Sequence, residues 1–430
     1  MDAFNENLNE QQAQQPMGCL HRFSKTIKVV IIGLLILLLM IPMFMIENLI
    51  SERGRTQEEA IDEVSEKWSL AQTITGPYLN LQYPVVTENN GEKKVSIKDL
   101  ILFPDELMVN GQLKTEILKR SIYEVNVYQS ELTLKGSFSS EELKKSRIDM
   151  DQLQFDRAAI CLNLTDMRGI SEQISITLGD SVYIFEPGMD NRGIANTGVH
   201  AIANLSELKQ NKKLPYEIKI KLKGSQSLNF IPLGKTTRVD LKANWNTPSF
   251  TGNYLPNNRN ITEKEFSAQW QVLNLNRNYS QVMADYNTSN IKDIENSSFG
   301  VNFKIPVEQY QQSMRSAKYA ILIILLTFGV IFFTEIMNKT RIHALQYLLV
   351  GLALCLFYSL LLSFSEHVGF NPAYLLSSAL TIILVGGYMF GITKKKKPSL
   401  IMSGLLGILY LYIFVLIQLE TFALLAGSLG

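Results

Sequence analysis

The stretch Ile27–Ile46, IKVVIIGLLILLLMIPMFMI, decides the fold of this chain. With Lys28 as its single charged residue, it is long enough for a helix to cross the ~30 Å of hydrocarbon in a bilayer. Four more apolar stretches follow near the C-terminal end, at about 317–337, 345–364, 372–392 and 400–418. The sequence therefore predicts a polytopic membrane protein with a large soluble region, 47–316, between its first and second spans.

Basic residues fall on alternate connections between these stretches. They are Arg22, Lys25 and Lys28 around the start of the first, Lys339 and Arg341 before the third, and the run Lys394–Lys397 before the fifth. Connections 365–371 and 419–421 contain no Lys or Arg. Because short cytoplasmic loops are enriched in these residues, we expect a disordered cytoplasmic tail at 1–26 and an outer domain at 47–316. No small-residue cleavage pattern follows the first stretch, so it is expected to be an uncleaved anchor.

The outer domain is predicted to be mainly β-sheet after one helix. The helix is expected at about 56–73, ending before Gly76-Pro77. Its apolar stripe consists of Ile61, Val64, Trp68 and Ala71. Alternating apolar and polar residues, typical of half-buried strands, follow at 123–127, 132–134, 218–222 and 239–241. The fold class is therefore a membrane protein of α+β type: a transmembrane anchor, a large β-rich outer domain and a C-terminal transmembrane helix bundle, 317–430.

A short internal repeat leaves two arrangements of the outer domain open. Leu132–Ser137 (LTLKGS) resembles Ile220–Ser225 (IKLKGS), 88 residues later. Either a two-fold duplication or coincidence between two amphipathic strands ending in glycine explains it. Both one sandwich and two small sub-domains fit the pattern.

Residue counts exclude several kinds of active site in the outer domain. His200 and Cys161 are its one histidine and its one cysteine, which excludes a zinc site made of several such ligands. No Gly-x-Ser-x-Gly motif supports a triad around His200, which is expected to be an ordinary loop or strand residue. A Ser-Lys dyad or a carboxylate pair stays open, because neither has a fixed spacing. We predict no catalytic residue, no metal and no cofactor.

Charge and cysteine placement narrow the partners and the redox chemistry. Residues 47–316 contain 31 Lys and Arg against 34 Asp and Glu, a balance that argues against a nucleic-acid partner. Cys19, Cys161 and Cys355 are expected in three different compartments, so no intramolecular disulfide is predicted.

Two sets of residues are candidates for function. The first is aromatic and brackets the turn-rich stretch 246–260: Trp245, Phe250, Tyr254 and Trp270. It is either packing around a structured loop, which is favoured, or a docking surface for a sugar polymer or a protein.

The second set is ionisable and lies near span ends: Glu335, Arg341, His343, Glu366 and His367. At span ends, interfacial caps and local ion pairs are favoured over a pathway for ions or protons. Glu335 and Glu366 stand ~30 Å apart by helix rise, so they cannot share one site.

Four blocks of sequence carry a family resemblance. They are Glu52-Arg53 with Trp68, Gln72 and Gly76-Pro77; Asp166–Ile170 (DMRGI); Ile231–Gly234 (IPLG) with Trp245–Pro256 (WNTPSFTGNYLP) and Ala268–Trp270 (AQW); and Arg341–Gly351 (RIHALQYLLVG) with Phe357-Tyr358 and Ser365–Phe370 (SEHVGF). In these blocks, from the first helix to the fourth span, the chain resembles the CreD family of bacterial inner-membrane proteins, also called cell-envelope integrity proteins.

The resemblance implies an inner-membrane location, a periplasmic domain between an N-terminal anchor and a helix bundle, and a role in envelope maintenance without assigned catalytic residues. Its blocks add Pro248, Gly252 and Pro256 to the candidate surface, and Gln346 and Tyr347 to the polar candidates. Members of the family usually continue through a sixth span, which residues 421–430 would begin.

These observations favour a non-enzymatic protein of the cell envelope. Its periplasmic β domain would bind or brace an envelope protein or glycan, and its bundle would hold it in the lipid bilayer. The alternative is a transporter or lipid-handling protein that works through the C-terminal bundle.

Overall fold

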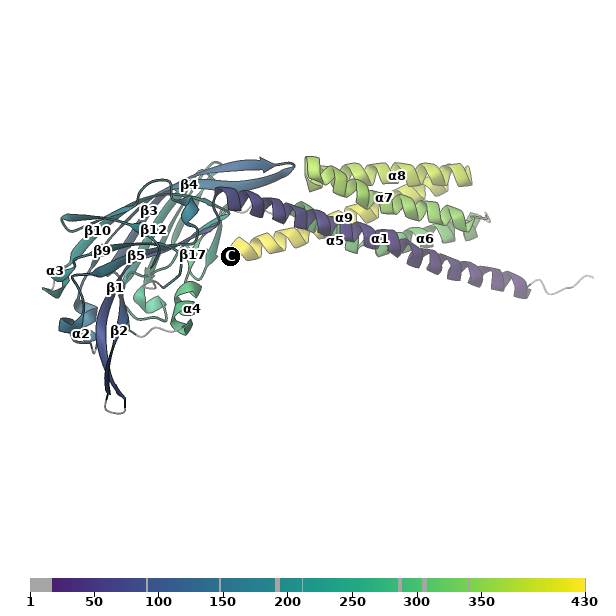
Figure 1. Cartoon of the computed structure of the whole chain (residues 1–430). Helices are drawn as coiled ribbons and strands as arrows, with labels where there is room; N and C mark the ends of the chain where they lie inside the picture. Colours follow the sequence, from purple (N-terminus) through teal and green to yellow (C-terminus); the bar gives the residue numbers. More distant parts are fainter. Residues whose placement is uncertain are drawn as a thin grey trace, which may run out of the picture. The chain divides into compact units, whose positions relative to one another are not determined.

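The computed structural model describes residues 18–89, 92–146, 148–189, 194–210, 212–284, 288–303, 308–338 and 341–429 (Figure 1). They form two compact units. The helical unit consists of residues 18–57 and 308–428, and the β unit consists of residues 58–303. The long helix α1 (Gly18–Trp68) contributes to both, because its apolar part belongs to the helical unit and its last turns belong to the β unit.

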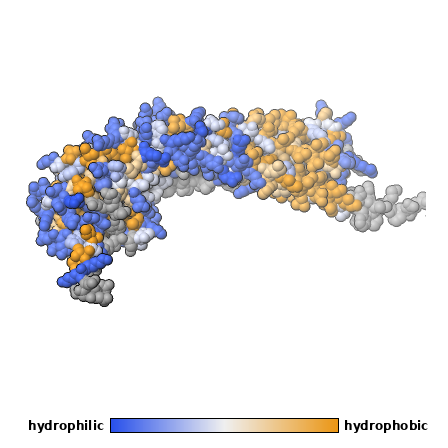
Figure 2. Space-filling view, in the orientation of Figure 1, coloured by the Kyte–Doolittle hydropathy of each residue, from blue (hydrophilic) through white to orange (hydrophobic). Residues whose placement is uncertain are grey.

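The helical unit contains the apolar helices of a polytopic membrane protein. After α1 come α5 (Glu308–Lys318), α6 (Ala320–Asn338), α7 (Ala344–Val368), α8 (Phe370–Thr393) and α9 (Lys396–Leu429). In the described part of the chain, five helices are long and apolar enough to cross a bilayer: α1, α6, α7, α8 and α9. Hydrophobic residues form a band on the visible face of this unit, with hydrophilic residues beyond it (Figure 2), as expected for helices surrounded by lipid. The predicted fold class is confirmed.

Helix α1 differs from the prediction at both ends. It is one helix from Gly18 to Trp68, whereas the sequence suggests a disordered tail up to residue 26 and a separate helix at 56–73. Residues 47–55 contain no proline, so nothing interrupts the helix after the apolar stretch. The helix also ends earlier than expected, at Trp68. Gly76-Pro77 does not terminate it but lies within strand β1, at an irregularity in the pairing of β1 with β5. Residues 1–17 of the tail lie outside the described residues.

Helix α9 also differs from the prediction. It continues without a break through 419–421 to Leu429, so the prediction of a non-helical connection at 419–421 is wrong. Neither glycine nor proline occurs in that connection, and the backbone therefore stays helical.

The described residues of the β unit form two sheets, of nine and eight strands. The first contains β1 (Gln72–Asn89), β2 (Glu92–Leu102), β5 (Ala158–Leu164), β8 (Glu186–Pro187), β9 (Val199–Ala203), β11 (Ser227–Phe230), β13 (Ser249–Gly252), β16 (Val282–Ala284) and β17 (Phe299–Asn302). The second contains β3 (Glu106–Arg120), β4 (Tyr123–Phe138), β6 (Ser175–Leu178), β7 (Ser181–Ile184), β10 (Leu214–Ser225), β12 (Thr236–Ala243), β14 (Asn258–Ile261) and β15 (Phe266–Leu273).

Most strand pairs are antiparallel, and the pairs β1–β11 and β3–β12 are parallel. Short helices lie between the strands: α2 (Glu141–Lys145), α3 (Ser206–Lys209), α4 (Thr288–Asn296), and the 3₁₀ turns η1 (Met150–Gln152), η2 (Met167–Gly169) and η3 (Asn274–Asn276).

One hydrophobic core joins the two sheets. Leu79 and Leu81 of β1 belong to the same buried cluster as Leu134 of β4 and Ile218 of β10. In β10, buried residues alternate with more exposed ones, as the alternation in the sequence predicts, whereas residues 74–81 of β1 and 125–128 of β4 are buried without a break. The β unit is therefore one sandwich and not two sub-domains.

The repeated LTLKGS and IKLKGS segments lie on β4 and β10, which are neighbouring antiparallel strands of one sheet. In their register, Gly136 faces Tyr216 and Gly224 faces Tyr128. A Cβ atom on Gly136 would lie 2.6 Å from the Tyr216 hydroxyl, and one on Gly224 would lie 2.3 Å from the Tyr128 hydroxyl. Each glycine makes room for a tyrosine across the pair, so cross-strand packing accounts for the glycine that ends both repeated segments.

Candidate partner surface and membrane polar clusters

The aromatic segment 245–270 is built on the core of the β unit. Trp270 of β15 is 2% exposed and Phe250 of β13 is 8% exposed. Their rings meet edge to face, with centroids 5.6 Å apart. Because their strands turn these rings into the sandwich, neither can contact a partner, which corrects the prediction for these two positions.

Four other predicted surface residues shape the segment. Gly252 has a φ of +96°, and a Cβ there would lie 2.2 Å from the carbonyl oxygen of Ser298, so a side chain would be strained and crowded. Pro248 is buried and Pro256 is half-buried. Trp245 is half-buried as well, and its indole N–H donates to the carbonyl oxygen of Thr247 at 3.0 Å. These four residues therefore order the loop and present little side-chain surface to a partner.

Tyr254 fixes the middle of the segment. Its carbonyl oxygen accepts a hydrogen bond from the Trp270 indole at 3.2 Å, and its hydroxyl donates to the carbonyl oxygen of Asn276 at 2.7 Å. Burial raises the pKa of this hydroxyl, and the nearby Arg277 guanidinium opposes that shift in part. Tyr254 thus connects the loop after β13 to the turn η3.

The residues that this arrangement exposes are leucines. Leu255, next to Tyr254, is 55% exposed, and Leu275, next to Asn276, is 87% exposed. The sequence analysis missed both. The pattern Leu273-Asn-Leu275 after a strand of alternating residues carries a weak signal, because its leucines continue the outward-facing positions of β15. We call Tyr254, Leu255 and Leu275 the leucine surface.

Glu335 of α6 belongs to a polar cluster at one end of the bundle. Its carboxylate pairs with the Lys28 ammonium of α1 and accepts a hydrogen bond from the Tyr347 hydroxyl at 3.2 Å. Lys28 also donates to the carbonyl oxygen of Ile342 at 2.7 Å. The cluster therefore fastens α1 and α6 to the start of α7.

His343 and Gln346 cap the same end of α7. The Leu345 amide donates to His343 Nδ1 at 3.3 Å, and the His343 amide donates to the Gln346 side-chain oxygen at 2.9 Å. This reciprocal capping box satisfies amides that the first turn of a helix leaves open. Arg341 is exposed just before the cap.

Glu366 forms a second cluster at the other end of α7. It accepts a hydrogen bond from the Tyr310 hydroxyl of α5 at 3.1 Å and lies 3.8 Å from Nε of Arg53 on α1. His367, the next residue, is exposed. Glu366 comes nineteen positions after Tyr347 on α7, about 28 Å of helix. Since Tyr347 bonds Glu335, the carboxylates of Glu335 and Glu366 lie in different clusters.

The remaining residues with reactive side chains, His200, Cys161 and Cys355, lie in packed parts of the structure. His200 lies on β9 opposite Cys161, and its Nδ1 is 2.8 Å from the carbonyl oxygen of Gly188. Neither Cys161 nor Cys355 is in a disulfide, and both are buried. Among the described residues, no group of three or more His, Cys, Asp or Glu side chains could hold a metal ion.

Comparison with known proteins identifies the family. The model of the family described as inner membrane protein CreD matches residues 24–430. The chain belongs to the CreD family. It is 32% identical over 400 residues to the inner membrane protein CreD of Escherichia coli strain K12, covering 91% of this chain and 87% of that protein. This CreD-family chain is therefore a multi-pass protein of the inner membrane.

The Asp166–Gly169 block of this CreD-family protein caps the C-terminal end of α1. Asp166 is buried, and its carboxylate accepts hydrogen bonds from the Leu70 amide at 2.9 Å and the Arg168 amide at 3.0 Å. The Arg168 guanidinium donates to the same carboxylate at 2.9 Å and to the carbonyl oxygen of Glu66 at 2.6 Å. Gln72 donates to the Asp166 carbonyl oxygen at 2.8 Å. We call these residues the helix joint, since they cap α1 and connect it to β1.

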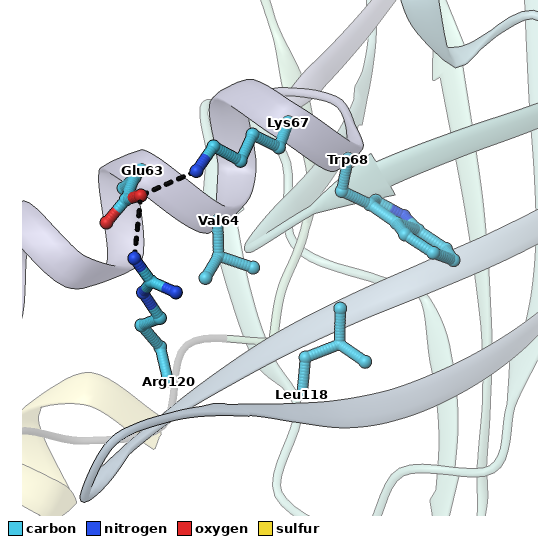
Figure 3. Close-up of a pocket in the computed structure, with 6 residues that line it drawn as sticks. All are labelled: Glu63, Val64, Lys67, Trp68, Leu118 and Arg120. Atoms are coloured by element: carbon cyan, nitrogen blue, oxygen red, sulfur yellow. Dashed lines mark hydrogen bonds and ion pairs between the residues drawn. The ribbon is translucent and has the colours of Figure 1, made fainter.

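A small cleft of about 180 Å³ lies beside the helix joint (Figure 3). Glu63 of α1 accepts hydrogen bonds from Lys67 at 2.6 Å and from Arg120, at the end of β3, at 3.0 Å. Val64 and Leu118 form its apolar wall. The cleft is small and its charged residues, Glu63, Lys67 and Arg120, already pair with one another, so it is a packing feature of the last turns of α1.

Proposed function

We propose that this protein is a non-enzymatic component of the cell envelope whose β unit, on the periplasmic side, binds an envelope protein or glycan through the leucine surface. The carrying observation is that Leu275 is 87% exposed on a loop held in place by hydrogen bonds to its neighbours. An ordered loop that keeps large apolar side chains in water loses the stabilisation of burying them, so their exposure favours a binding role.

The orientation is part of the proposal. The alternation of basic connections supports a cytoplasmic N-terminus and a periplasmic β unit. A Leu275→Cys variant that also carries Cys19→Ser, labelled with a membrane-impermeant maleimide, tests it, because the two remaining cysteines, Cys161 and Cys355, are buried. Labelling in cells with a permeable outer membrane and an intact inner membrane is expected. Labelling only after the inner membrane is disrupted would refute the orientation.

Binding is tested by photo-crosslinking in living cells from Leu255 and Leu275. Val182, an equally apolar and exposed residue at the edge of the second sheet, serves as the matched control. We expect a discrete crosslinked product from the two leucine positions and none from Val182. The same product from all three positions, or from none of them, would contradict the proposed surface.

The clusters in the bundle support fastening more than transport. Glu335 pairs with Lys28 and Tyr347, and Glu366 pairs with Tyr310 and Arg53, so each carboxylate holds α1 against other helices. A charge used for transport would instead face a continuous polar path between the clusters.

A further inference from the structure

A groove of about 690 Å³ opens between the second half of α6 and the start of α9. Both walls come from the helical unit. One wall is apolar and is formed by Phe333 and Met337 of α6 with Ile401 of α9. The other is basic and is formed by Lys395, Lys396 and Lys397. All six side chains are exposed, so the groove is open on its outer side.

The basic wall has a net positive charge. None of the residues lining the groove is acidic. Glu335, the carboxylate that follows Thr334 on α6, pairs with Lys28 and Tyr347. The ammonium groups of Lys395–Lys397 therefore give this side of the groove a positive electrostatic potential.

The backbone adds to this potential. Lys394 adopts the left-handed conformation, with a φ of 49°, and ends α8 there. Helix α9 begins at Lys396, so its first turn, with unpaired amides and the positive end of the helix dipole, carries two of the lysines. An anion at the groove would interact with both the side chains and the helix terminus.

The apolar wall selects among anions. Phe333, Met337 and Ile401 are exposed, and they lie on helices long and apolar enough to span the bilayer. A free anion such as phosphate would neutralise the lysines and leave these side chains uncovered. A ligand with a negatively charged head group and hydrocarbon chains satisfies both walls at once.

We propose that this groove binds an anionic phospholipid, with its head-group phosphate on Lys395–Lys397 and its acyl chains against Phe333, Met337 and Ile401. Basic pockets between membrane helices on the cytoplasmic side are suited to such head groups. The site is independent of the leucine surface, because it lies in the other unit.

The test uses the full-length protein in neutral detergent, with bound lipid counted by native mass spectrometry. Dioleoyl phosphatidylglycerol is compared with zwitterionic dioleoyl phosphatidylcholine. We expect phosphatidylglycerol to bind at least about tenfold tighter, and Lys395→Gln to weaken it about fivefold, the effect of removing one favourable lysine. The triple variant Lys395→Gln, Lys396→Gln, Lys397→Gln should bind the two lipids equally. These side chains are exposed, so the variants are expected to fold.

Lys394→Gln is the matched control, because Lys394 belongs to the same run and does not line the groove. Its affinity for phosphatidylglycerol should stay within about twofold of wild type. Phe333→Ser tests the apolar wall and should weaken both lipids. Equal weakening by Lys394→Gln and Lys395→Gln would replace the site with diffuse attraction. Displacement of the lipid by millimolar inorganic phosphate would replace it with a free-anion site. Either result overturns the proposal.

Discussion

The helix joint makes a sharp prediction about Asp166. Asp166→Asn keeps the size of the side chain but replaces one acceptor oxygen with an NH₂ group. Asp166 accepts from the Leu70 amide at 2.9 Å, the Arg168 amide at 3.0 Å and the Arg168 guanidinium at 2.9 Å. At least one of these donors would then face a donor and lose its partner.

The magnitude follows from the burial of the carboxylate. A hydrogen bond to a charged acceptor contributes about 1.5–3 kcal/mol. The Arg168 side chain is 56% exposed, so its ion pair adds no more than ~1 kcal/mol. We therefore expect Asp166→Asn to lower the local stability of the helix joint by ~2 kcal/mol. Where amide exchange proceeds through local opening of the joint, this loss makes exchange about thirtyfold faster.

Hydrogen exchange of the full-length protein in detergent measures this at the amides of residues 69–73. Glu172→Gln is the matched control, because it removes a carboxylate that pairs with Lys221 at 2.8 Å on the surface, where both side chains are about half exposed. Its effect should stay below ~0.5 kcal/mol. If the two variants exchange at the same rate in residues 69–73, the assignment of the joint to Asp166 is refuted.

The pH dependence gives a second readout of the same variant. Burial raises the pKa of Asp166, but hydrogen bonds from Arg168 and from the Leu70 amide outweigh it, so the pKa is lower than its ordinary value. The contribution of the carboxylate is therefore fully present above about pH 4 and is lost as the pH falls through the lowered pKa. The difference between wild type and Asp166→Asn should shrink below about pH 4. A difference that stays constant or grows there would contradict this.

Three further predictions concern packing and buried charge. Gly351→Leu should separate α1 from α7 and lower the melting temperature, because a Cβ at Gly351 would lie 2.1 Å from a Leu39 methyl. Gly387→Leu is the control and should be tolerated, because no atom lies within 4 Å of a Cβ built there. Equal changes in melting temperature would refute the contact between Gly351 and Leu39. Lys28→Glu should destabilise the detergent-purified protein by about 3 kcal/mol, and adding Glu335→Lys should restore part of it; a double variant less stable than the single one would refute the pair. Arg277→Met should cost about 3 kcal/mol in chemical unfolding, because it leaves the buried side-chain oxygen of Gln281 without its donor and removes one of the two donors to the carbonyl oxygen of Leu233. A loss below ~1 kcal/mol would show that water reaches the Gln281 oxygen.

Local patterns in the sequence were sufficient for the membrane part of the fold and for the β class of the centre. Apolar length alone predicts helices α1, α6, α7, α8 and α9, because each must satisfy its own backbone hydrogen bonds in lipid. Alternation in 218–222 predicts which side chains of β10 are buried, because the period of a strand is two. In 123–127 it predicts the buried Tyr123, Val125 and Val127 of β4 but not Asn126, which is buried as well.

The candidate surface could not be predicted in the same way. Trp245, Phe250, Tyr254 and Trp270 look equivalent in the sequence, yet Phe250 and Trp270 enter the core while Tyr254 forms the rim. Whether each ring is buried depends on how β13 pairs with β17 and how β15 pairs with β12, strands that do not adjoin them in the sequence. The sequence also could not show that the two repeated segments pair with each other, because that depends on the register of β4 with β10.

By itself, the sequence determined the membrane-spanning helices, the β-rich centre and the family, because these depend on residue type and on spacing along the chain. Only the tertiary structure decided that α1 ends at the Asp166–Arg168 joint, that Glu335 and Glu366 are paired with α1, and that leucines are the exposed apolar residues beside the aromatic segment. Each of these depends on contacts between residues distant in sequence, and the free energy of such contacts is set by geometry and burial that no local pattern contains.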